Sequence, residues 1–247
     1  MGNLFSTRCR SARWKWFDSR VPGFQTLVIV GAARMIFGVK GKFFLPTALV
    51  IVFALSRIPG VLPQNFSAAY ALVFCAGVYF AGKTAWWLPL VVLFCTDVGL
   101  NLYYWLSLNI NVWELSVLKY QLFNYVAYVF LIWLGRRFRP QSSFISLLGG
   151  GVAGALLFYL ITNSASWLFN PFHNPEYTKN FAGWLAALTK GTAGWPQTWE
   201  FFRNTLLSGG LFTGLFVGAM KLEEKAESEE QESPATESEE QPENAGN

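Results

Sequence analysis

The chain has 247 residues, of which 53% are hydrophobic and 17% aromatic, while only 14% are charged. A typical soluble domain has about 25% charged residues, so this composition excludes an ordinary water-soluble fold. The formal net charge is +4. The basic residues border hydrophobic stretches and form no stripe on a soluble domain, which argues against nucleic acid as a partner.

Six mostly apolar stretches, separated by short polar connections, fill the chain from Phe43 to Leu222. Each is close to the roughly 20 residues that a helix needs to cross a hydrocarbon layer. Lipid cannot satisfy backbone polar groups, so spans of this length are expected to be helices. The sequence predicts an all-α, polytopic membrane bundle of six transmembrane helices, at about Phe43–Leu62, Phe66–Gly82, Trp86–Leu106, Trp113–Leu134, Phe144–Phe169 and Thr205–Leu222.

Residues 1–42 form a basic N-terminal extension that is expected to be interfacial or disordered. The segment Val21–Val39 is apolar enough to suggest a seventh crossing, but it contains Pro22 and Arg34, and crossing here would put basic residues on the wrong side. That alternative stays open. Met35 is an alternative start, because it lies just before Lys40 and the first clear span.

Asp97 is the one carboxylate deep inside a predicted span, where an unpaired charge is unfavourable by several kcal/mol. It is therefore expected to point into the bundle. Asn101 follows it by four residues, on the same helical face. Arg57 is its most obvious counter-charge. Two interpretations stay open, a buried ion pair that fixes helix register and a contact to a ligand or ion.

The predicted fifth span carries a polar cluster at its outer end, made of Thr162, Asn163, Ser164 and Ser166. Such groups often bond across helices, but their position on the same side as Asn65 also suggests a ligand cavity that opens outward. Phe181, Trp184, Leu185 and Leu188 then repeat at helical spacing and predict a short amphipathic helix on the outer surface, either a lid or a fixed interfacial anchor.

Small residues are spaced for close helix contact in the last two spans. Gly210, Gly214 and Gly218 recur every four residues in the sixth span, and Gly150 and Gly154 do so in the fifth. This spacing lets backbones approach closely, which predicts packing within the chain or against another membrane subunit.

Residues 223–247 contain ten of the fifteen acidic residues and no large apolar residue. Such a composition predicts a disordered acidic tail, which serves either as a solubilising extension or as a docking segment for a basic partner. In the remainder, five basic residues fall on one side of the predicted membrane topology and thirteen on the other. That bias predicts a multi-pass inner-membrane protein with both termini in the cytoplasm.

The chain shows no familiar catalytic pattern, such as a nucleophile elbow, a zinc-binding His pair or a phosphate-binding loop. The three cysteines are scattered, and His173 is the single histidine. The sequence therefore predicts that the protein is not an enzyme and has neither a metal site nor a cofactor.

Several short motifs suggest a family. They include the run Pro63-Gln64-Asn65-Phe66-Ser67, followed by Ala71-Leu72 and Gly77-Val78-Tyr79-Phe80, then Asp97, Thr162-Asn163 with Trp167, and Phe201-Phe202-Arg203-Asn204-Thr205-Leu206-Leu207. Together they resemble an uncharacterised bacterial integral-membrane family, a domain of unknown function, over residues 43–222.

That family is similar in span number and size to the S components of energy-coupling-factor vitamin transporters. The similarity implies capture of a small molecule from outside, with a transmembrane coupling subunit and ATPases as partners. The chain departs from both patterns at two points. Ser208-Gly209-Gly210 stands where the family often has Gly-Asp, and Ala48 and Ala54 lack the four-residue spacing that S components present to their partner.

The predicted function is therefore a substrate-binding or transport component for a small, vitamin-like organic solute captured from the outer face. The rival is a structural or assembly protein whose polar residues only lock helix packing, and an ion channel is disfavoured because repeated pore-lining charge is absent from the sequence. The predicted substrate contacts are Asn65, Asp97, Asn101, Asn163, Arg203 and Asn204, with Arg57 as counter-charge.

Overall fold

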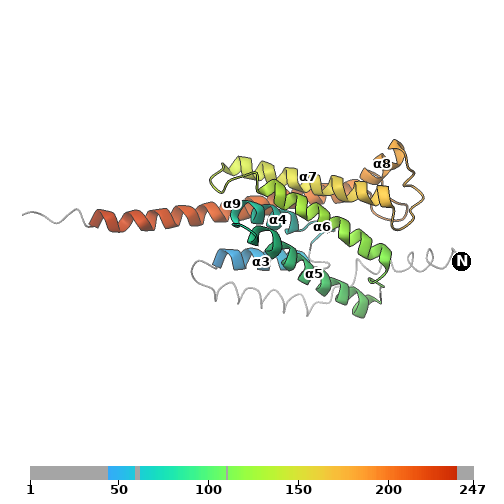
Figure 1. Ribbon diagram of the computed structural model, residues 1–247, viewed down its shortest axis with the longest axis horizontal. Coiled ribbons are helices and arrows are strands. Elements are labelled where there is room, and N and C mark those ends of the chain that lie inside the picture. The colour runs from blue at the N-terminus through green and yellow to red at the C-terminus, as the bar shows by residue number, and fades with distance from the viewer. Residues whose placement is uncertain (1–43, 59–61, 110, 238–247) are drawn as a thin grey trace, which may run out of the picture.

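A computed structural model describes residues 44–58, 62–109 and 111–237, and these form seven helices with no strand among them (Figure 1). The all-α prediction is confirmed for this part of the chain. The helices are α3 (Phe44–Ser56), α4 (Ala69–Tyr79), α5 (Thr84–Leu108), α6 (Leu115–Gly135), α7 (Phe144–Phe169), α8 (Phe181–Leu188) and α9 (Thr198–Glu237).

Four of these helices are long and apolar enough to cross a membrane, so the chain is a multi-pass membrane protein. They are α5, α6, α7 and the first 28 residues of α9, Thr198–Lys225. Each carries large apolar side chains on its outer surface, among them Leu106, Ile145 and Leu207. A soluble protein would hide such residues, whereas acyl chains accept them.

The first two predicted spans form helices that are shorter than expected. Helix α3 has 13 residues and α4 has 11, which correspond to about 20 Å and about 16 Å of rise. Neither length reaches across about 30 Å of hydrocarbon. The breaks coincide with Pro59, Gly60 and Pro63 in the sequence between the helices, because proline removes a backbone donor and glycine weakens a helix.

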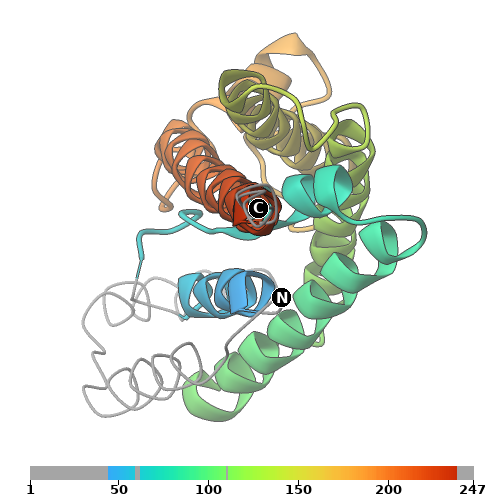
Figure 2. The ribbon, with the colours of Figure 1, turned by 90° about the vertical axis from the view of Figure 1, so that its left-hand side faces the viewer.

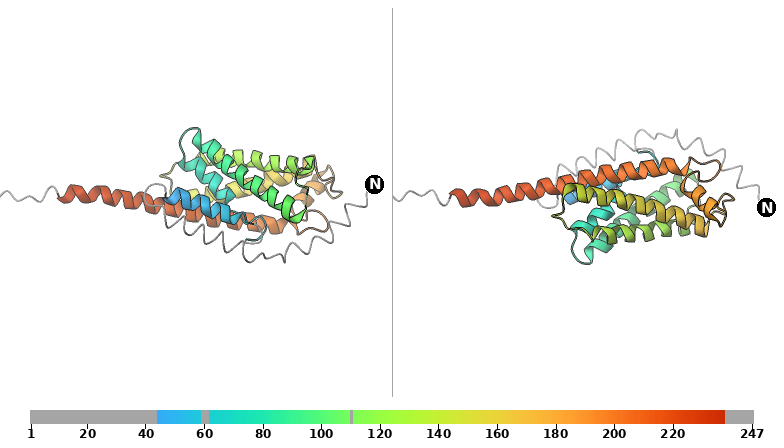
Figure 3. Two further views of the ribbon diagram at one scale, coloured as in Figure 1. Left: turned by 90° about the horizontal axis from the view of Figure 1, so that it is seen from below. Right: turned by 90° about the horizontal axis from the view of Figure 1, so that it is seen from above.

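The bundle has two distinct ends. One end, here called the basic end, carries the α4–α5 and α6–α7 connections and its cations are Lys83, Arg136, Arg137, Arg139 and Lys221. Lys221 of α9 donates a hydrogen bond to the Pro140 carbonyl at 3.4 Å, which fixes α9 to the α6–α7 connection. The opposite end, here called the loop end, carries the α5–α6 connection and α8 (Figures 1 and 3).

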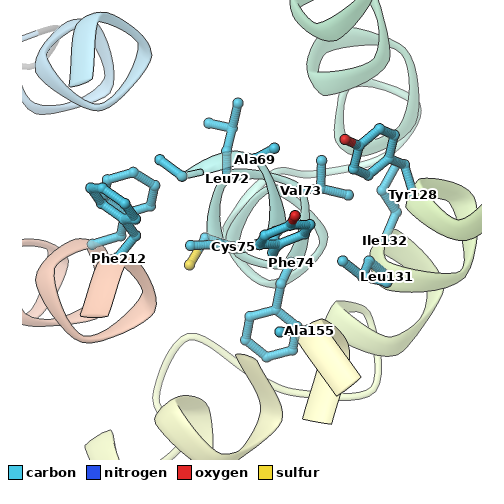
Figure 4. Close-up of a cluster of buried hydrophobic side chains, with 14 of the residues drawn as sticks. Ala69, Leu72, Val73, Phe74, Cys75, Tyr128, Leu131, Ile132, Ala155 and Phe212 are labelled. Carbon is cyan, nitrogen blue, oxygen red and sulfur yellow. The ribbon is translucent and has the colours of Figure 1, made fainter. Parts of the chain in front are cut away.

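Helix α4 lies at the centre of the bundle, where it packs against α5, α6, α7 and α9. Ten of its 11 residues are buried, so it faces protein on every side and needs no lipid-facing surface. The end-on view in Figure 2 shows α4 between its neighbours, and Figure 4 shows the core around Phe74, with Ile132 from α6, Ala155 from α7 and Phe212 from α9.

Helix α9 continues without a break to Glu237 and projects beyond the other helices at the basic end (Figure 1). The disorder expected from Glu223 onward stays a prediction, and the described part of that segment, up to Glu237, belongs to α9. Glu, Lys, Gln and Ala have high helix propensity, and extending an existing helix avoids the unfavourable nucleation step. Residues 1–42, with the possible seventh crossing, lie outside the described residues, as do residues 238–247.

Glycines bring two pairs of helices, α4 with α6 and α7 with α9, into close contact. A Cβ on Gly135 of α6 would lie 2.3 Å from the Phe74 carbonyl oxygen, and one on Gly77 of α4 would lie 2.5 Å from the Ile132 carbonyl oxygen. Between α7 and α9, a Cβ on Gly151 would lie 2.2 Å from Thr213 Oγ1, and one on Gly209 would lie 2.5 Å from the Ala155 Cβ.

The glycine repeat predicted on α9 lies in looser surroundings. Cβ atoms at Gly210, Gly214 and Gly218 would meet α7 at ordinary distances of 3.5–3.9 Å. Among the glycines of α9, the closest approach to α7 is therefore at Gly209, one residue before the repeat.

Gly135→Ala is expected to destabilise the fold by about 1–3 kcal/mol, because its methyl group must push the α4 backbone away. Gly149→Ala is the matched control, since a Cβ there meets nothing within 4 Å and alanine favours a helix. Thermal unfolding in detergent measures both. Equal stability of the two variants would contradict the close α4–α6 contact.

Candidate functional site

The candidate site begins where α3 ends and α4 starts. The Ser56 hydroxyl donates to the Phe53 carbonyl at 2.7 Å and accepts from the Ala68 backbone N–H at 3.0 Å. The end of α3 and the start of α4 therefore lie side by side. Residues 57–68, here called the α3–α4 link, connect the two helices without helical structure in their described part, which omits 59–61.

The site lies near the middle of the membrane-spanning layer. Asp97 follows the first residue of α5 by 13 residues and precedes the last by 11. At 1.5 Å per residue it is about 20 Å from the basic end and about 17 Å from the loop end of that helix. The 13 residues of α3 rise by a similar distance from the basic end, which brings Arg57 to the level of Asp97.

Arg57 and Asp97 form an ion pair at this level. The Nη2 group of Arg57 donates to Oδ1 of Asp97, and the Tyr125 hydroxyl of α6 donates to Oδ2 at 2.7 Å. The two charged side chains keep 17% and 18% of their surface exposed. Both carboxylate oxygens thus have a donor, and the pair joins α3 to α5 and α6.

Arg57 is surrounded by aromatic side chains. Its guanidinium lies 6.0 Å from the centre of the Phe53 ring. Four tyrosines interact electrostatically with it: Tyr70 of α4, Tyr104 of α5, and Tyr125 and Tyr128 of α6. The Nε–H of Arg57 is buried and has no hydrogen-bond acceptor among the described residues. Tyr128 forms a side-chain hydrogen bond with the guanidinium group. A buried unpaired donor is unfavourable by about 1–3 kcal/mol, so an acceptor for the Nε–H would stabilise the cluster.

Asn101 lies one turn beyond Asp97 on α5 and forms a second polar contact with α6. Its amide donates to Gln121 Oε1 at 3.3 Å, and Gln121 Nε2 donates to Asn101 Oδ1 at 2.9 Å. Gln121 precedes Tyr125 by one turn of α6. The two contacts therefore form adjacent polar layers between α5 and α6, with Asn101 and Gln121 on the side of the loop end.

The α3–α4 link carries another predicted contact, Asn65, which is exposed and has a positive φ of 60°. Asparagine tolerates this left-handed conformation better than most residues. The Tyr70 hydroxyl donates to the Asn65 carbonyl at 3.3 Å. Asn204 of α9 donates to the Gln64 carbonyl at 2.9 Å, so it holds the link against α9.

Asn163 and Arg203 lie apart from the ion pair, near the loop end. The Asn163 amide donates to the Tyr159 carbonyl of its own helix at 2.9 Å. Arg203 is exposed and lies 5.6 Å from the centre of the Trp199 ring. The structure therefore brings Arg57, Asp97 and Asn101 together, places Asn65 and Asn204 at the link, and leaves Asn163 and Arg203 outside both groups.

Sequence reasoning missed the α6 side of the site. Gln121 and Tyr125 are four residues apart, the same spacing as Asp97 and Asn101, and this matched spacing on consecutive helices was a usable signal. Tyr70, Tyr104 and Tyr128 carried no comparable signal. An isolated tyrosine in an apolar span is usual, and only the folded arrangement shows that these hydroxyl groups surround one arginine.

Helix α8 occupies the predicted residues, Phe181–Leu188, and is held firmly at the loop end. Trp184 Nε1 donates to Ser164 Oγ of α7 at 2.9 Å, and the Tyr159 hydroxyl donates to the Leu188 carbonyl. Phe181 and Leu185 remain exposed. These contacts favour a fixed interfacial anchor over a lid, because any opening would break bonds at the middle and at the C-terminal end of the helix.

Arg57→Met is expected to lower the free energy of unfolding by about 3 kcal/mol, because it leaves Asp97 without its cationic partner. Arg57→Met with Asp97→Leu is expected to recover most of the loss, since removing both charges leaves none unpaired. Chemical unfolding in detergent, arranged as a double-mutant cycle, measures the coupling. Purely additive effects would show that the two side chains do not interact.

Comparisons with known proteins place the chain in a family. No curated protein and no solved structure matches it. The chain matches the family of unknown function DUF6580 over residues 38–232, which includes every described helix apart from the last residues of α9. The match covers more than half of the chain, and the protein therefore belongs to the DUF6580 family.

Proposed function

We propose that the protein binds a small organic solute at the cluster formed by Arg57, Asp97, Asn101, Gln121 and Tyr125, and that the solute enters from the loop end. The observation that carries this proposal is a charged, partly accessible pair at the middle of the spans, next to backbone that is not helical. An intramembrane ion pair is rare, and it commonly marks a path for a substrate or ion.

The α3–α4 link supports the proposal through its backbone. Non-helical backbone at membrane depth is tolerated where protein buries it or where it lines a water-filled cavity. Pro63, Gln64 and Asn65 of the link are exposed, so surrounding protein does not cover them. Their carbonyl oxygens accept hydrogen bonds from the Phe66 N–H, Asn204 and the Tyr70 hydroxyl, so it is the exposed backbone N–H groups of Gln64 and Asn65 that are open to water or a ligand. Interrupted helices with polar residues at the break are a recurring feature of transporter binding sites.

The side chains of the cluster suit a solute that carries oxygen acceptors. Arginine has five N–H donors, and the free Nε–H of Arg57 points to an acceptor that the described residues do not supply. The surrounding tyrosines add aromatic surface and hydroxyl groups. A carboxylate- or carbonyl-bearing organic molecule, vitamin-like in size, fits this combination of one strong donor group and aromatic walls.

The proposed topology puts the basic end in the cytoplasm of a bacterial cell, with the protein in the inner membrane. Helix α3 begins at the basic end, and α4 returns to it. The two helices count as two crossings if the link reaches the outer interface, and as one re-entrant hairpin otherwise. Both arrangements give α5 and all later helices the same orientation in the membrane. The outward-facing loop end is then the entrance for the solute.

Transport across the membrane would require further components. The proposed binding site lies near the middle of the bundle, and we propose a transmembrane coupling subunit and ATPases as the partners that would release the solute inside. The support for these partners is the resemblance to S components inferred from the sequence, which is an argument from fold analogy.

The second candidate function is structural, with the polar residues serving only to lock the helices. The reciprocal bonds between Asn101 and Gln121 favour it, since they satisfy both amides within the protein. The unpaired Arg57 Nε–H favours solute binding instead. Solute binding predicts that a folded variant of the cluster loses a ligand, whereas a structural role predicts that there is no ligand to lose.

A reporter that is active only outside the cytoplasm, fused after Asn247, is expected to be inactive. The same reporter inserted at Asn111 in the α5–α6 connection is expected to be active, because this connection lies at the loop end. The excess of cations at the basic end is the physical reason. Strong activity at the carboxyl terminus would reverse the proposed orientation.

Protein purified gently from membranes is expected to carry a small molecule that native mass spectrometry detects. Arg57→Lys is expected to lose most of this molecule. Lysine preserves the charge that faces Asp97, but it removes Nε–H and the planar arrangement of donors. Arg137→Lys at the basic end is the control, since Arg137 lies over the Trp133 ring, away from the cluster.

The thermal stability of each variant is measured in parallel. A substitution in a ligand site removes the ligand from a protein that stays folded, whereas a substitution in a contact that only packs helices lowers stability. Loss of the molecule from a stable Arg57→Lys protein supports solute binding. Equal retention by both variants, or a native protein that carries no molecule, would favour the structural alternative.

A further inference from the structure

The balance of charge in the cluster indicates how a solute would bind there. Arg57 and Asp97 neutralise each other, and the pair keeps less than a fifth of its surface exposed. In a low-dielectric interior, adding one further charge is unfavourable by several kcal/mol unless something compensates it. Any solute that brings a charge must therefore change the charge of the cluster.

Among the described residues, the unused hydrogen-bonding group of the cluster is a donor on the cation, Arg57. Both oxygens of Asp97 already accept hydrogen bonds, one from Arg57 and one from Tyr125. Arg57, in contrast, has a buried Nε–H without an acceptor. A ligand with two adjacent oxygens is the preferred partner of a guanidinium group, because the two groups form parallel hydrogen bonds. The chemistry of the site therefore favours a carboxylate over an ammonium group.

From these observations we propose that the solute is a monoanionic carboxylate and that its binding takes up one proton at Asp97. This inference rests on the proposed solute site. The anion replaces Asp97 as the partner of Arg57, and the buffered solvent gives up one proton, which binds to Oδ1 of Asp97, the oxygen that the guanidinium leaves. The Tyr125 hydroxyl continues to donate to Oδ2. The cluster is neutral before binding and neutral afterwards.

The neighbours of Asp97 leave it as the group that accepts the proton. The titratable and charged groups that face the pair are Arg57 after α3, Tyr70 on α4, Tyr104 on α5, and Tyr125 and Tyr128 on α6. Arginine keeps its proton at all physiological pH values, and tyrosine hydroxyls ordinarily stay neutral below about pH 10. Asp97 is the carboxylic acid of this group, and the proposal therefore assigns the proton to it.

Proton uptake would link solute binding to pH. If one proton enters with each anion, the affinity falls by up to about tenfold for each unit of rising pH. It would also couple solute movement to the proton gradient, because the anion and the proton leave the site together. Without a bound anion, the ion pair holds α3 against α5 and α6, and binding of the anion breaks it.

The test uses the full-length protein in detergent, with benzoate as probe and benzamide as its neutral counterpart. Isothermal titration calorimetry in phosphate and in Tris buffers at the same pH reports the number of protons taken up for each benzoate bound. The expected value is close to one for the native protein. Benzamide is expected to bind without proton uptake, because it adds no charge to the cluster.

Asp97→Asn separates proton uptake from a purely structural role. Asparagine resembles the protonated acid, so this variant is expected to bind benzoate with no proton uptake and with an affinity that is independent of pH between 6 and 8. At pH 8 it is expected to bind at least tenfold more tightly than the native protein. A structural role for the pair predicts the reverse, weaker binding in a less stable protein.

The outcomes distinguish this inference from the proposed function. Benzoate binding without proton uptake, or loss of binding in a folded Asp97→Asn variant, would overturn proton coupling and leave the solute site in place. Retention of a co-purified molecule through Arg57, together with no benzoate binding at pH 6, would overturn the carboxylate class. Absence of any Arg57-dependent ligand would overturn the solute site itself.

Discussion

The ion pair between Arg57 and Asp97 is the interaction on which the rest of the structure depends. It lies at about half the length of α5, where neither charge could remain unpaired in a hydrocarbon layer. Arg57 therefore ties the end of α3 to α5, and Tyr125 extends the contact to α6. At the same level the Ala68 N–H donates to Ser56 Oγ, so α3 ends and α4 starts side by side.

Helix α4 explains how so short a segment is stable inside a membrane protein. It is enclosed by α5, α6, α7 and α9, and close contact at Gly77 and Gly135 brings its backbone next to that of α6. A helix surrounded by protein has no need to match the thickness of the hydrocarbon, whereas α5, α6, α7 and α9 do. The four long helices therefore face lipid, and the short helix α4 packs between them.

Much of this arrangement was predictable from the sequence. There are physical reasons why the remainder was not. Apolar length predicts α5, α6, α7 and α9, and the isolation of Asp97 in a span predicts that it needs a partner. The shortness of α4 was hidden, because burial on all sides gives the same apolar composition as exposure to lipid. The tyrosines around Arg57 come from three helices, and no local spacing reveals such a group.

Access of water to the ion pair from the loop end is the central claim, and cysteine labelling tests it most directly. In a variant without Cys9, Cys75 and Cys95, Ser67→Cys places a thiol in the link, next to the bonded pair of Ser56 and Ala68. Phe94→Cys is the control, because this exposed residue on α5 lies within one turn of Asp97. A charged, membrane-impermeant thiol reagent added outside intact cells is predicted to label Ser67→Cys and to leave Phe94→Cys unlabelled, since thiolates form in water and not in lipid. An unreactive Ser67→Cys, or equal labelling of both variants, would contradict a water-filled approach to Arg57 and Asp97.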